Sequence, residues 1–516
     1  MNVVLDQMKL DDVDAMAAFG RELAAVVQAG DIILLGGDLG AGKTTLARAI
    51  IHALAPRNGA FEVPSPTFTL VQAYDTTRIP VMHADLYRVT GRDEAAELGL
   101  EETGAAGLLL VEWPERAREL FHGNVLEIEL EESFAGEGRT AKLTPHGRWR
   151  ELLPRVEALR TFLERSGWSG SERHFLQGDA SSRRYERLRW AANGTAHPPA
   201  VLMDMPPKPD GPPVRDGLPY SRIAHLAEDV RPFVAIDKFL RAQGLSGPAI
   251  YAADIEHGFL VLEDLGDAVF AEMARAGADM AEPVAEAVEV LLKLAEVEPP
   301  HTLPIADEAW YALPHYDLRA REIEVELLLD WYWPAEIGSP APDEARHGFL
   351  QEWRRLWPLV EAGPAGLMLR DYHSPNLMWL PQRQGIERVG IIDFQDAMIG
   401  HLAYDLVSLL QDARVDMPPD LEPRLLDHYL ARRQASATAF DVEGFRAAYA
   451  VFGAQRAVKI LGIFTRLSKR DNKHGYLRHM PRMRRHLERN LRHEKLTGLR
   501  QWFAQHLPGA MTDTGD

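Results

Sequence analysis

The segment GDLGAGKT, residues 37–44, decides the fold of the N-terminal part of this chain. It satisfies the pattern GxxxxGK[ST] and stands between an apolar run at residues 31–35 and a helical pattern that begins near Thr44. Glycines in such a turn let backbone amides face a phosphate group, and the helix N-terminus adds partial positive charge. The sequence therefore predicts an α/β domain with a cradle for nucleotide phosphates.

The residues of this cradle have distinct expected roles. Lys43 bridges the β- and γ-phosphates, and the hydroxyl of Thr44 binds Mg²⁺. Two carboxylates that follow apolar runs, Asp85 and Glu112, are candidates to complete the metal site, because the carboxyl ends of parallel strands face the nucleotide; the alternative is that each is a solvated strand end. The expected nucleotide contacts are Gly37, Asp38, Gly40, Ala41, Gly42, Lys43, Thr44 and Thr45.

Four motifs in order resemble the TsaE ATPase family of bacterial tRNA threonylcarbamoyladenosine synthesis. They are GDLGAGKTTL, SPTFTL at 65–70, HADLYR at 83–88 and VEWPER at 111–116. The resemblance covers residues 1–147 and implies that Thr67 lies in a nucleotide-sensing switch, that Asp85 helps to hold Mg²⁺, and that Glu112 with Trp113 supports ATP hydrolysis. It also implies protein partners in a complex that modifies adenosine 37 of tRNA.

The size and composition of the chain limit what surrounds this domain. A length of 516 residues predicts two or three domains, and a Pro/Gly break places the first boundary near Gly147, giving domains at 1–147 and 148–516. The formal net charge of −19 argues against a broad grip on nucleic acid, so contact with tRNA is expected to be indirect. The chain has no cysteine, no apolar run near ~20 residues and an acidic N-terminus, so we expect a cytoplasmic protein without membrane contact.

A second phosphate-transfer pattern lies in the C-terminal part. The run LRDYHSPNL at 369–377 places Asn376 five residues after Asp371, which is the spacing of a kinase catalytic loop. Seventeen residues after Asn376, the segment GIIDF ends an apolar run at Asp393. We expect Asp371 to accept the proton of the substrate hydroxyl, and Asn376 and Asp393 to hold Mg²⁺. An isolated DxxxxN is common in loops, and the downstream Asp393 makes the catalytic interpretation stronger.

Two upstream segments are candidates for the nucleotide side of this second site. The turn at 178–182, in FLQGDASSRRYERL, would cover phosphates through the amides and hydroxyls of Ser181 and Ser182, although a plain surface hairpin fits almost equally well. The segment FLVLEDLGD at 259–267 would form the hinge between two lobes, with main-chain groups of Glu263 and Leu265 at the adenine; the alternative is an ordinary strand that ends in a glycine turn. The Pro- and Gly-rich stretch at 206–219 is expected to be an exposed loop.

Residues 155–500 resemble the aminoglycoside phosphotransferase family, which implies a bilobal, protein-kinase-like α+β domain. The motifs GDASSRRY, LMDMPP, LEDLGD, RDYHSPNL and IDFQDA are most similar to its N-acetylmuramate/N-acetylglucosamine kinase group, which acts on the anomeric hydroxyl in peptidoglycan recycling. Two positions depart from the general kinase pattern. Leu369 replaces the histidine of the catalytic loop, and VLMDMPP at 201–207 contains no strand-three lysine to bind phosphate.

A cationic stripe on a helical segment bears on the substrate. At ~100° per residue, Arg456, Lys459, Arg466 and Arg470 fall on about one quarter of the helix circumference. A solvated helix face is the simpler interpretation, but a stripe in the cleft would bind an anion such as the lactyl carboxylate of N-acetylmuramate and would repel a polycationic aminoglycoside. The predicted substrate-binding residues are His373, Arg456, Lys459 and Arg466.

The sequence thus predicts a bifunctional enzyme that uses ATP and Mg²⁺. A P-loop ATPase would support tRNA modification, and a kinase would phosphorylate an amino sugar. Two alternatives for the C-terminal domain stay open: a kinase for another small alcohol such as an aminoglycoside, choline or homoserine, and a nucleotide-binding pseudokinase, which the absent lysine would suggest.

Overall fold

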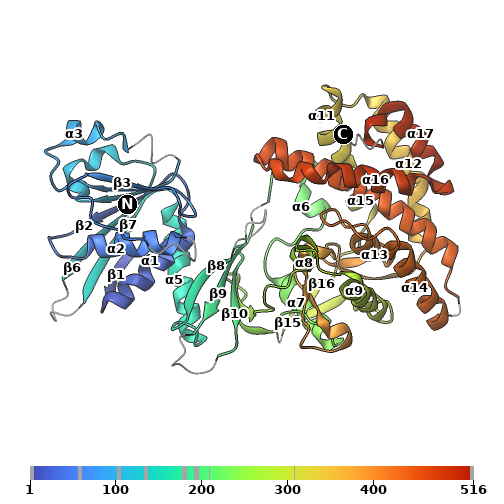
Figure 1. Ribbon diagram of the computed structural model, residues 1–516, viewed down its shortest axis with the longest axis horizontal. Helices are drawn as coiled ribbons and strands as arrows, with labels where there is room; N and C mark the ends of the chain where they lie inside the picture. Colours follow the sequence, from blue (N-terminus) through green and yellow to red (C-terminus); the bar gives the residue numbers. More distant parts are fainter. Residues whose placement is uncertain are drawn as a thin grey trace. The chain divides into compact units, whose positions relative to one another are not determined.

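The computed structural model describes residues 5–55, 61–100, 106–132, 138–176, 183–190, 197–208, 210–306, 308–437 and 439–511. The chain divides into two compact units, each with mixed α/β structure (Figure 1). The first comprises residues 1–177 and 186–197, and the second comprises residues 178–185 and 198–516. Strands β8 (Glu172–Leu176) and β9 (Arg184–Arg189) lie where the units divide. The boundary near residue 147 stays a prediction.

The first unit contains a seven-stranded sheet in the order β1-β7-β6-β2-β5-β4-β3. Strand β2 is parallel to both β5 and β6, and β4 is parallel to β5, whereas β1, β3 and β7 are antiparallel to their neighbours. The elements are β1 (Leu5–Leu10), α1 (Val13–Val26), β2 (Asp31–Gly36), α2 (Lys43–Leu54), β3 (Val71–Tyr74), β4 (Val81–Asp85), α3 (Arg92–Ala96), β5 (Leu108–Glu112), β6 (Asn124–Glu132), β7 (Arg139–Pro145) and α5 (Trp149–Arg165).

Alternating side chains of the central strand enter the cores on the two faces of this sheet. Ile33 and Leu35 pack in a core with residues of α1, α2 and α5, whereas Leu34 packs in a second core with residues that follow β4 and β5. This is the two-residue period of a strand that is buried on both faces. Helix α5 is fixed to this unit by Trp149 in the core and by the ion pair of Arg148 with the buried Asp31.

The second unit combines small antiparallel sheets with many helices. Its sheet strands are β10 (Ala200–Asp204), β11 (Pro213–Arg215), β12 (Leu218–Pro219), β13 (Ile250–Asp254), β14 (Phe259–Glu263), β15 (Thr302–Ala306), β16 (Ala309–Ala312), β17 (Ala365–Met368), β18 (Leu377–Trp379), β19 (Val389–Ile391) and β20 (Met398–His401). Its helices are α6 (Tyr220–Ile223), α7 (Arg231–Ala242), α8 (Phe270–Arg275), α9 (Ala281–Leu294), α10 (Leu318–Leu327), α11 (Trp333–Ile337), α12 (Asp343–Glu361), α13 (Ala403–Leu410), α14 (Leu421–Ser436), α15 (Val442–Asp471), α16 (Met480–Leu491) and α17 (Thr497–His506).

Two features of this unit differ from the sequence-based expectation. The stretch at 206–219 is not only a loop, because it includes the antiparallel pair β11 and β12. Asp216 and Gly217, at the turn between them, both have positive φ values of 51° and 73°, as the tight turns of hairpins require. After residue 279, where the sequence pattern is mainly helical, the structure also contains the short strands β15, β16, β17, β18, β19 and β20.

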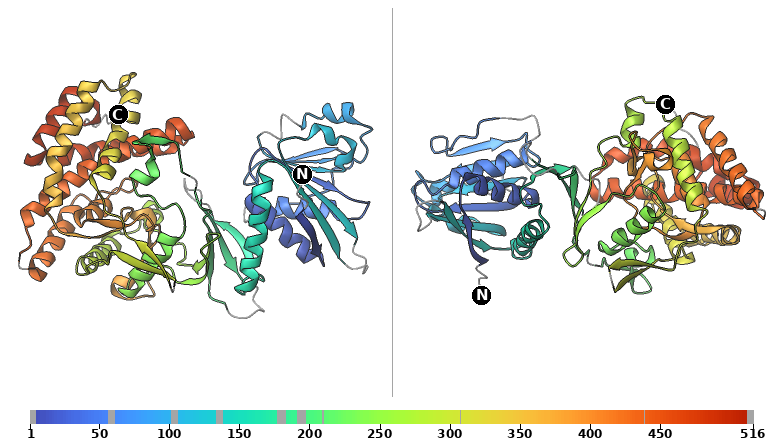
Figure 2. Two further views of the ribbon diagram at one scale, coloured as in Figure 1. Left: turned by 180° about the vertical axis from the view of Figure 1, so that it is seen from behind. Right: turned by 90° about the horizontal axis from the view of Figure 1, so that it is seen from below.

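Helix α15 is the central helix of the second unit (Figures 1 and 2). It is the one helix of the described ranges that is long and apolar enough to cross a membrane, with a mean hydropathy of 1.2 over its best 18-residue window. However, 94% of that window is buried inside the protein. Its length and apolar character therefore serve the protein core.

Helix α15 passes so close to α10 that only glycine fits at the contact. A Cβ atom on Gly462 would lie 2.4 Å from the backbone carbon and oxygen of Leu327. In an exposed helix, replacing glycine with alanine stabilises the fold by roughly 0.5–1 kcal/mol. Here the main chain of α10 would have to move, and such overpacking costs roughly 1–3 kcal/mol.

We therefore predict that Gly462→Ala lowers the free energy of unfolding of the second unit by about 1–2 kcal/mol. The matched control is Gly348→Ala in α12, where the added Cβ would meet only ordinary contacts with Trp502 at 3.5 and 3.6 Å. That variant should be neutral or more stable by up to ~1 kcal/mol. Urea unfolding of both variants tests this, and an unchanged or stabilised Gly462→Ala protein would contradict it.

Candidate functional sites

The phosphate-binding loop of the first unit connects β2 to α2. Gly37, Gly40 and Gly42 have φ values of 121°, 82° and 104°, a region that side chains with a Cβ rarely adopt. Lys43 turns back over this loop, and its Nζ donates to the carbonyl oxygens of Gly37 at 2.6 Å and Asp38 at 2.8 Å. Burial lowers the pKa of Lys43, and Glu112 acts against that shift. The loop thus holds a cation beside the position expected for phosphate.

Glu112 links the loop to the neighbouring strands. Its Oε2 accepts from the hydroxyl of Thr44 at 2.8 Å, and its Oε1 lies 2.9 Å from Nε2 of His83. Glu112 is 2% exposed and ends β5, beside the end of β2. The indole ring of Trp113 lies under the ammonium group of Lys43, 3.7 Å from Nζ to the ring centroid. The structure therefore brings together Lys43, Thr44 and Glu112, which the sequence assigned to one site.

Asp85 occupies the corresponding end of β4, directly opposite Glu112 in the parallel register. Its Oδ2 accepts from the hydroxyls of Ser65 at 3.1 Å and Thr67 at 2.7 Å, and its Oδ1 accepts from the amide of Tyr87. The segment expected to sense the nucleotide is thus attached to the expected metal carboxylate. Carboxylate and hydroxyl oxygens are suitable ligands for Mg²⁺.

The candidate catalytic loop of the second unit, residues 369–377, follows β17. The side chain of Asn376 donates to the backbone carbonyl of Asp371 at 3.0 Å and to Oδ2 of Asp393 at 3.3 Å. Asp393 has a positive φ of 59° and also accepts from Gln395 at 3.1 Å. Asn376 therefore joins the main chain of Asp371 to the carboxylate of Asp393, and the oxygens of Asn376 and Asp393 fit a hard cation such as Mg²⁺.

Asp405 takes over the anchoring of this loop, in which Leu369 replaces the usual histidine. The amides of Leu369 and Arg370 donate to the two carboxylate oxygens of Asp405 at 2.5 and 2.9 Å. Asp412 similarly accepts from the amide of Ser374 at 2.7 Å. Burial raises the pKa of Asp405 to about 7, and the two amide bonds and Arg456 oppose that shift. The loop is thus held through its backbone by carboxylates from the segment that follows β20.

Positive groups surround the proposed catalytic base. Burial alone would raise the pKa of Asp371, but the permanent cations Lys459, Arg370 and Arg456 outweigh burial and lower it. Asp371 is therefore ionised at neutral pH, as a proton acceptor must be. Burial also lowers the pKa of His373 and so favours its neutral imidazole.

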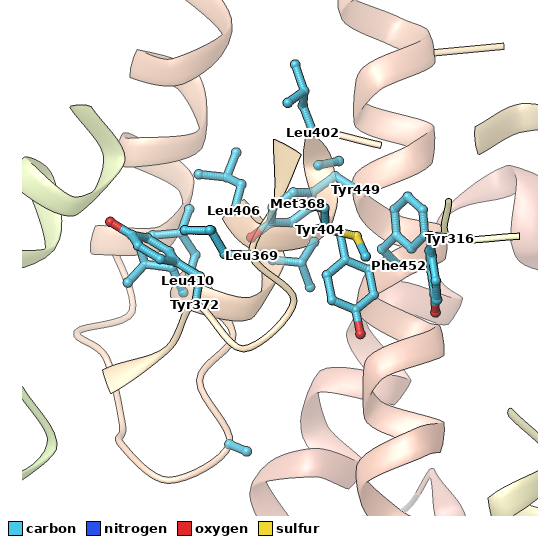
Figure 3. Close-up of a cluster of buried hydrophobic side chains, with 14 of the residues drawn as sticks. Tyr316, Met368, Leu369, Tyr372, Leu402, Tyr404, Leu406, Leu410, Tyr449 and Phe452 are labelled. Carbon is cyan, nitrogen blue, oxygen red and sulfur yellow. The ribbon is translucent and has the colours of Figure 1, made fainter. Parts of the chain in front are cut away.

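Two cations of the predicted stripe lie in a buried polar network. Lys459 donates to Oε1 of Glu324 at 2.7 Å, and Arg456 donates to the backbone carbonyl of Arg370 at 3.2 Å. Lys459 also reaches the hydroxyl of Tyr404 at 3.3 Å. Figure 3 shows the ring of Tyr404 beside Phe452, at a centroid distance of 5.4 Å. Arg456 and Lys459 are 6% and 7% exposed, so the solvated-face interpretation is wrong for them, and their role in substrate binding stays a prediction.

Arg466, about two to three turns further along α15, has a different environment. Its guanidinium lies 5.5 Å from the ring centroid of Tyr220, and its Nε has no hydrogen-bond partner among the residues that the structure describes. Burial lowers its pKa, and Arg470 acts in the same direction. Arg470 itself pairs with Asp471. Arg466 therefore retains a donor atom that no described residue uses.

The nucleotide side of this site is partly described. In the hinge segment, the amides of Glu263 and Asp264 donate to the carbonyls of Ala249 and Pro199 at 2.7 and 3.1 Å. These two amides are therefore already bonded within the protein. The expected contact with adenine would be made by Leu265 and by carbonyl groups, and it stays a prediction. Ser181 and Ser182 lie outside the described residues.

Two family models match this chain. The model for "Threonylcarbamoyl adenosine biosynthesis protein TsaE" matches residues 10–141, and the "Phosphotransferase enzyme family" model matches residues 172–449, more than half of the chain. The chain belongs to the phosphotransferase enzyme family. Its N-terminal part is a TsaE-family domain, so two ATP-using families are fused in one polypeptide.

Curated relatives match each part. The N-acetylmuramate/N-acetylglucosamine kinase of Caulobacter vibrioides is 38% identical over 370 residues, which are 69% of this chain and 97% of the relative. The enzyme of the same name from Pseudomonas putida is 34% identical over 307 residues, 59% of this chain and 79% of the relative. The TsaE protein of Rickettsia bellii is 37% identical over 130 residues, 25% of this chain and 89% of the relative.

Sequence reasoning missed several residues that support these sites. His83 holds Glu112 in the TsaE-family domain, and Asp405, Asp412 and Glu324 hold the catalytic loop of the phosphotransferase unit. His83 had a usable signal, because it stands two positions before Asp85 on the same strand. Glu324 had none, since its cationic partners Arg370 and Lys459 are 46 and 135 residues away.

The geometry of the phosphotransferase site predicts different losses for its two carboxylates. Asp371→Asn should abolish phosphoryl transfer and preserve ATP binding, because the amide keeps the shape but cannot accept the proton. Asp393→Ala should impair both, because without this carboxylate Mg²⁺ is not held against the phosphates and their charge stays uncompensated.

Calorimetry with MgATP checks this prediction, in a Lys43→Ala background that silences the first nucleotide site, with product formation assayed in parallel. Substantial turnover by Asp371→Asn would refute its role as the base.

Proposed function

We propose that the second unit is a kinase for the anomeric hydroxyl of N-acetylmuramate and N-acetylglucosamine. The observation that carries this proposal is that Asn376 bonds both the main chain of Asp371 and the carboxylate of Asp393, in a chain that is 38% identical to an N-acetylmuramate/N-acetylglucosamine kinase over 97% of that enzyme. Asp371 orients the hydroxyl and accepts its proton, while Asn376 and Asp393 hold the Mg²⁺ that accompanies ATP.

The unit is bilobal in this proposal, with the segment around Glu263 and Leu265 as the hinge at the adenine. The intact trio of Asp371, Asn376 and Asp393 favours a kinase over a nucleotide-binding pseudokinase. A kinase for an aminoglycoside, choline or homoserine is the remaining alternative, and the cationic surroundings of Asp371 oppose a cationic substrate.

For the first unit, we propose the ATPase activity that supports threonylcarbamoylation of tRNA. The support is the TsaE match together with the placement of Lys43, Thr44 and Glu112 around one loop. Thr44 and Asp85 hold Mg²⁺. Thr67, which donates to the carboxylate of Asp85, lies in the segment that responds to the bound nucleotide. The partners are other proteins of the modification complex, and the contact with tRNA is indirect. The proposed location of both activities is the cytoplasm.

We propose that Arg466 binds the lactyl carboxylate of N-acetylmuramate. It combines partial burial with an Nε that no described residue accepts from, whereas Arg456 is bonded to the backbone of the catalytic loop. A charge-assisted hydrogen bond contributes roughly 1.5–3 kcal/mol. N-acetylmuramate carries this carboxylate and N-acetylglucosamine lacks it. A loss of activity that is larger with N-acetylmuramate therefore indicates a contact with the carboxylate.

Loss of Lys43 should separate the two activities. We predict that Lys43→Ala abolishes support of tRNA threonylcarbamoylation and leaves sugar phosphorylation unchanged, because Lys43 neutralises phosphate charge only in the first unit. The modified nucleoside is measured in cells that lack their own ATPase of this type. Lys142→Ala, an exposed lysine on β7, is the control. Restoration of the nucleoside by Lys43→Ala would refute the proposal for the first unit.

Arg466→Ala should reduce kcat/KM for N-acetylmuramate about tenfold or more relative to N-acetylglucosamine. Arg456→Ala should instead reduce turnover of both sugars, because it disturbs the backbone of the catalytic loop at Arg370. The measurement follows ATP consumption with the two sugars and with kanamycin, in a Lys43→Ala background. Equal losses on both sugars for Arg466→Ala would exclude the carboxylate role, and preference for kanamycin would exclude the amino-sugar kinase.

A further inference from the structure

Strand β10, which lacks the lysine expected of a kinase, ends in a negative charge instead. Asp204 ends strand β10 and is 5% exposed. Arg184 donates to its Oδ2 from Nε at 3.1 Å and from Nη2 at 2.7 Å. A carboxylate cannot bind nucleotide phosphate, and this guanidinium is committed to that carboxylate. The cation for the phosphates must therefore come from another residue.

The preceding residue, Arg183, reaches the catalytic site. Its Nη2 lies 2.6 Å from Oδ1 of Asp393, and its Nη1 donates to Oε1 of Gln395 at 2.8 Å. Successive side chains of an extended segment point in opposite directions, which explains why Arg183 and Arg184 serve different carboxylates. The Arg183 side chain is only 13% exposed, so its guanidinium is held in place.

We propose that Arg183 binds the phosphates of the nucleotide in the second unit and thus replaces the strand-three lysine. The inference rests on the proposed kinase function, because it uses Asp393 as the carboxylate that holds the metal ion of the nucleotide. Arg183 contacts one oxygen of that carboxylate, and the other faces Asn376. The guanidinium therefore lies where phosphate oxygens must approach the metal ligands, with donors that fit phosphate in a bidentate manner.

Under this proposal, Arg183 binds Asp393 when no nucleotide is present and binds phosphate oxygens when MgATP is present. Without ligand, it compensates the charge of Asp393 and keeps that carboxylate oriented toward Asn376. With Asp393 engaged by a metal ion, the attraction between Arg183 and the carboxylate falls, and Arg183 exchanges it for phosphate oxygens. Gln395, which bonds both Arg183 and Asp393, keeps the two groups together during the exchange.

Two simpler roles of Arg183 predict different effects of its removal on ligand binding. If Arg183 served only as the counter-ion of Asp393 in the ligand-free protein, it would compete with the metal ion, and its removal would tighten the binding of MgATP. If it served only the fold, its removal would weaken every ligand of the site equally, including adenosine, which has no phosphate.

The test is calorimetry of MgATP and adenosine with Arg183→Gln in the full chain, in the Lys43→Ala background. We expect MgATP to bind about tenfold to a hundredfold more weakly, adenosine to bind unchanged, and Arg183→Lys to recover part of the MgATP affinity. The control is Arg446→Gln, which removes a surface ion pair with Asp427 and should change neither affinity.

Unchanged or tighter MgATP binding by Arg183→Gln would overturn the proposal, and so would a parallel loss of adenosine. Because this measurement needs no sugar, it stays decisive if the proposed sugar substrate is wrong. A failure of the kinase function itself would appear separately, as a protein that binds MgATP through Arg183 but phosphorylates none of the sugars.

Discussion

The buried carboxylate of Glu324 is the interaction on which the phosphotransferase site depends. Glu324 is 0% exposed, pairs with Arg370 and Lys459 through Oε1, and accepts from Tyr316 and Gln455 through Oε2. Burial alone would raise its pKa, but the two cations outweigh burial and hold the pKa at about 2. A buried charge is tolerated only when it is fully paired. Loss of any partner would leave this buried charge incompletely paired. The network therefore fixes the catalytic loop, α10 and α15 relative to one another.

The network also determines the field at the reacting atoms. The charge of Arg370 and Lys459 exceeds that of Glu324 alone, and the excess acts on Asp371, whose pKa is lowered. Arg370 has a φ of 70° and also donates to the carbonyl of Ala224. A strained backbone conformation at this residue persists because several contacts determine it. The same contacts that stabilise the loop thus keep the carboxylate of Asp371 ionised.

The sequence predicted the local parts of both sites better than their supports. Both phosphate-transfer motifs were found because their residues lie close together in the chain, as Asp371 and Asn376 do, and the structure brings these groups into contact. The cationic stripe was identified by helical period, but the period cannot tell which face of α15 is buried. The carboxylate that pairs with Lys459 comes from α10, and no local pattern connects residues so far apart. Arg183 was overlooked for a similar reason, since its partner Asp393 follows 210 positions later along the sequence.

The two sites hold their phosphate-binding cations in chemically different ways before a nucleotide arrives. Lys43 is bonded to neutral carbonyls of its own loop, whereas Arg183 is bonded to a carboxylate. Bonds between neutral groups contribute roughly 0.5–1.5 kcal/mol and bonds to charged groups roughly 1.5–3 kcal/mol. Lys43 can therefore exchange its partners for phosphate with little dependence on a metal ion. Release of Arg183 requires that the charge of Asp393 be compensated first, so the second site couples phosphate binding to metal binding through a single carboxylate.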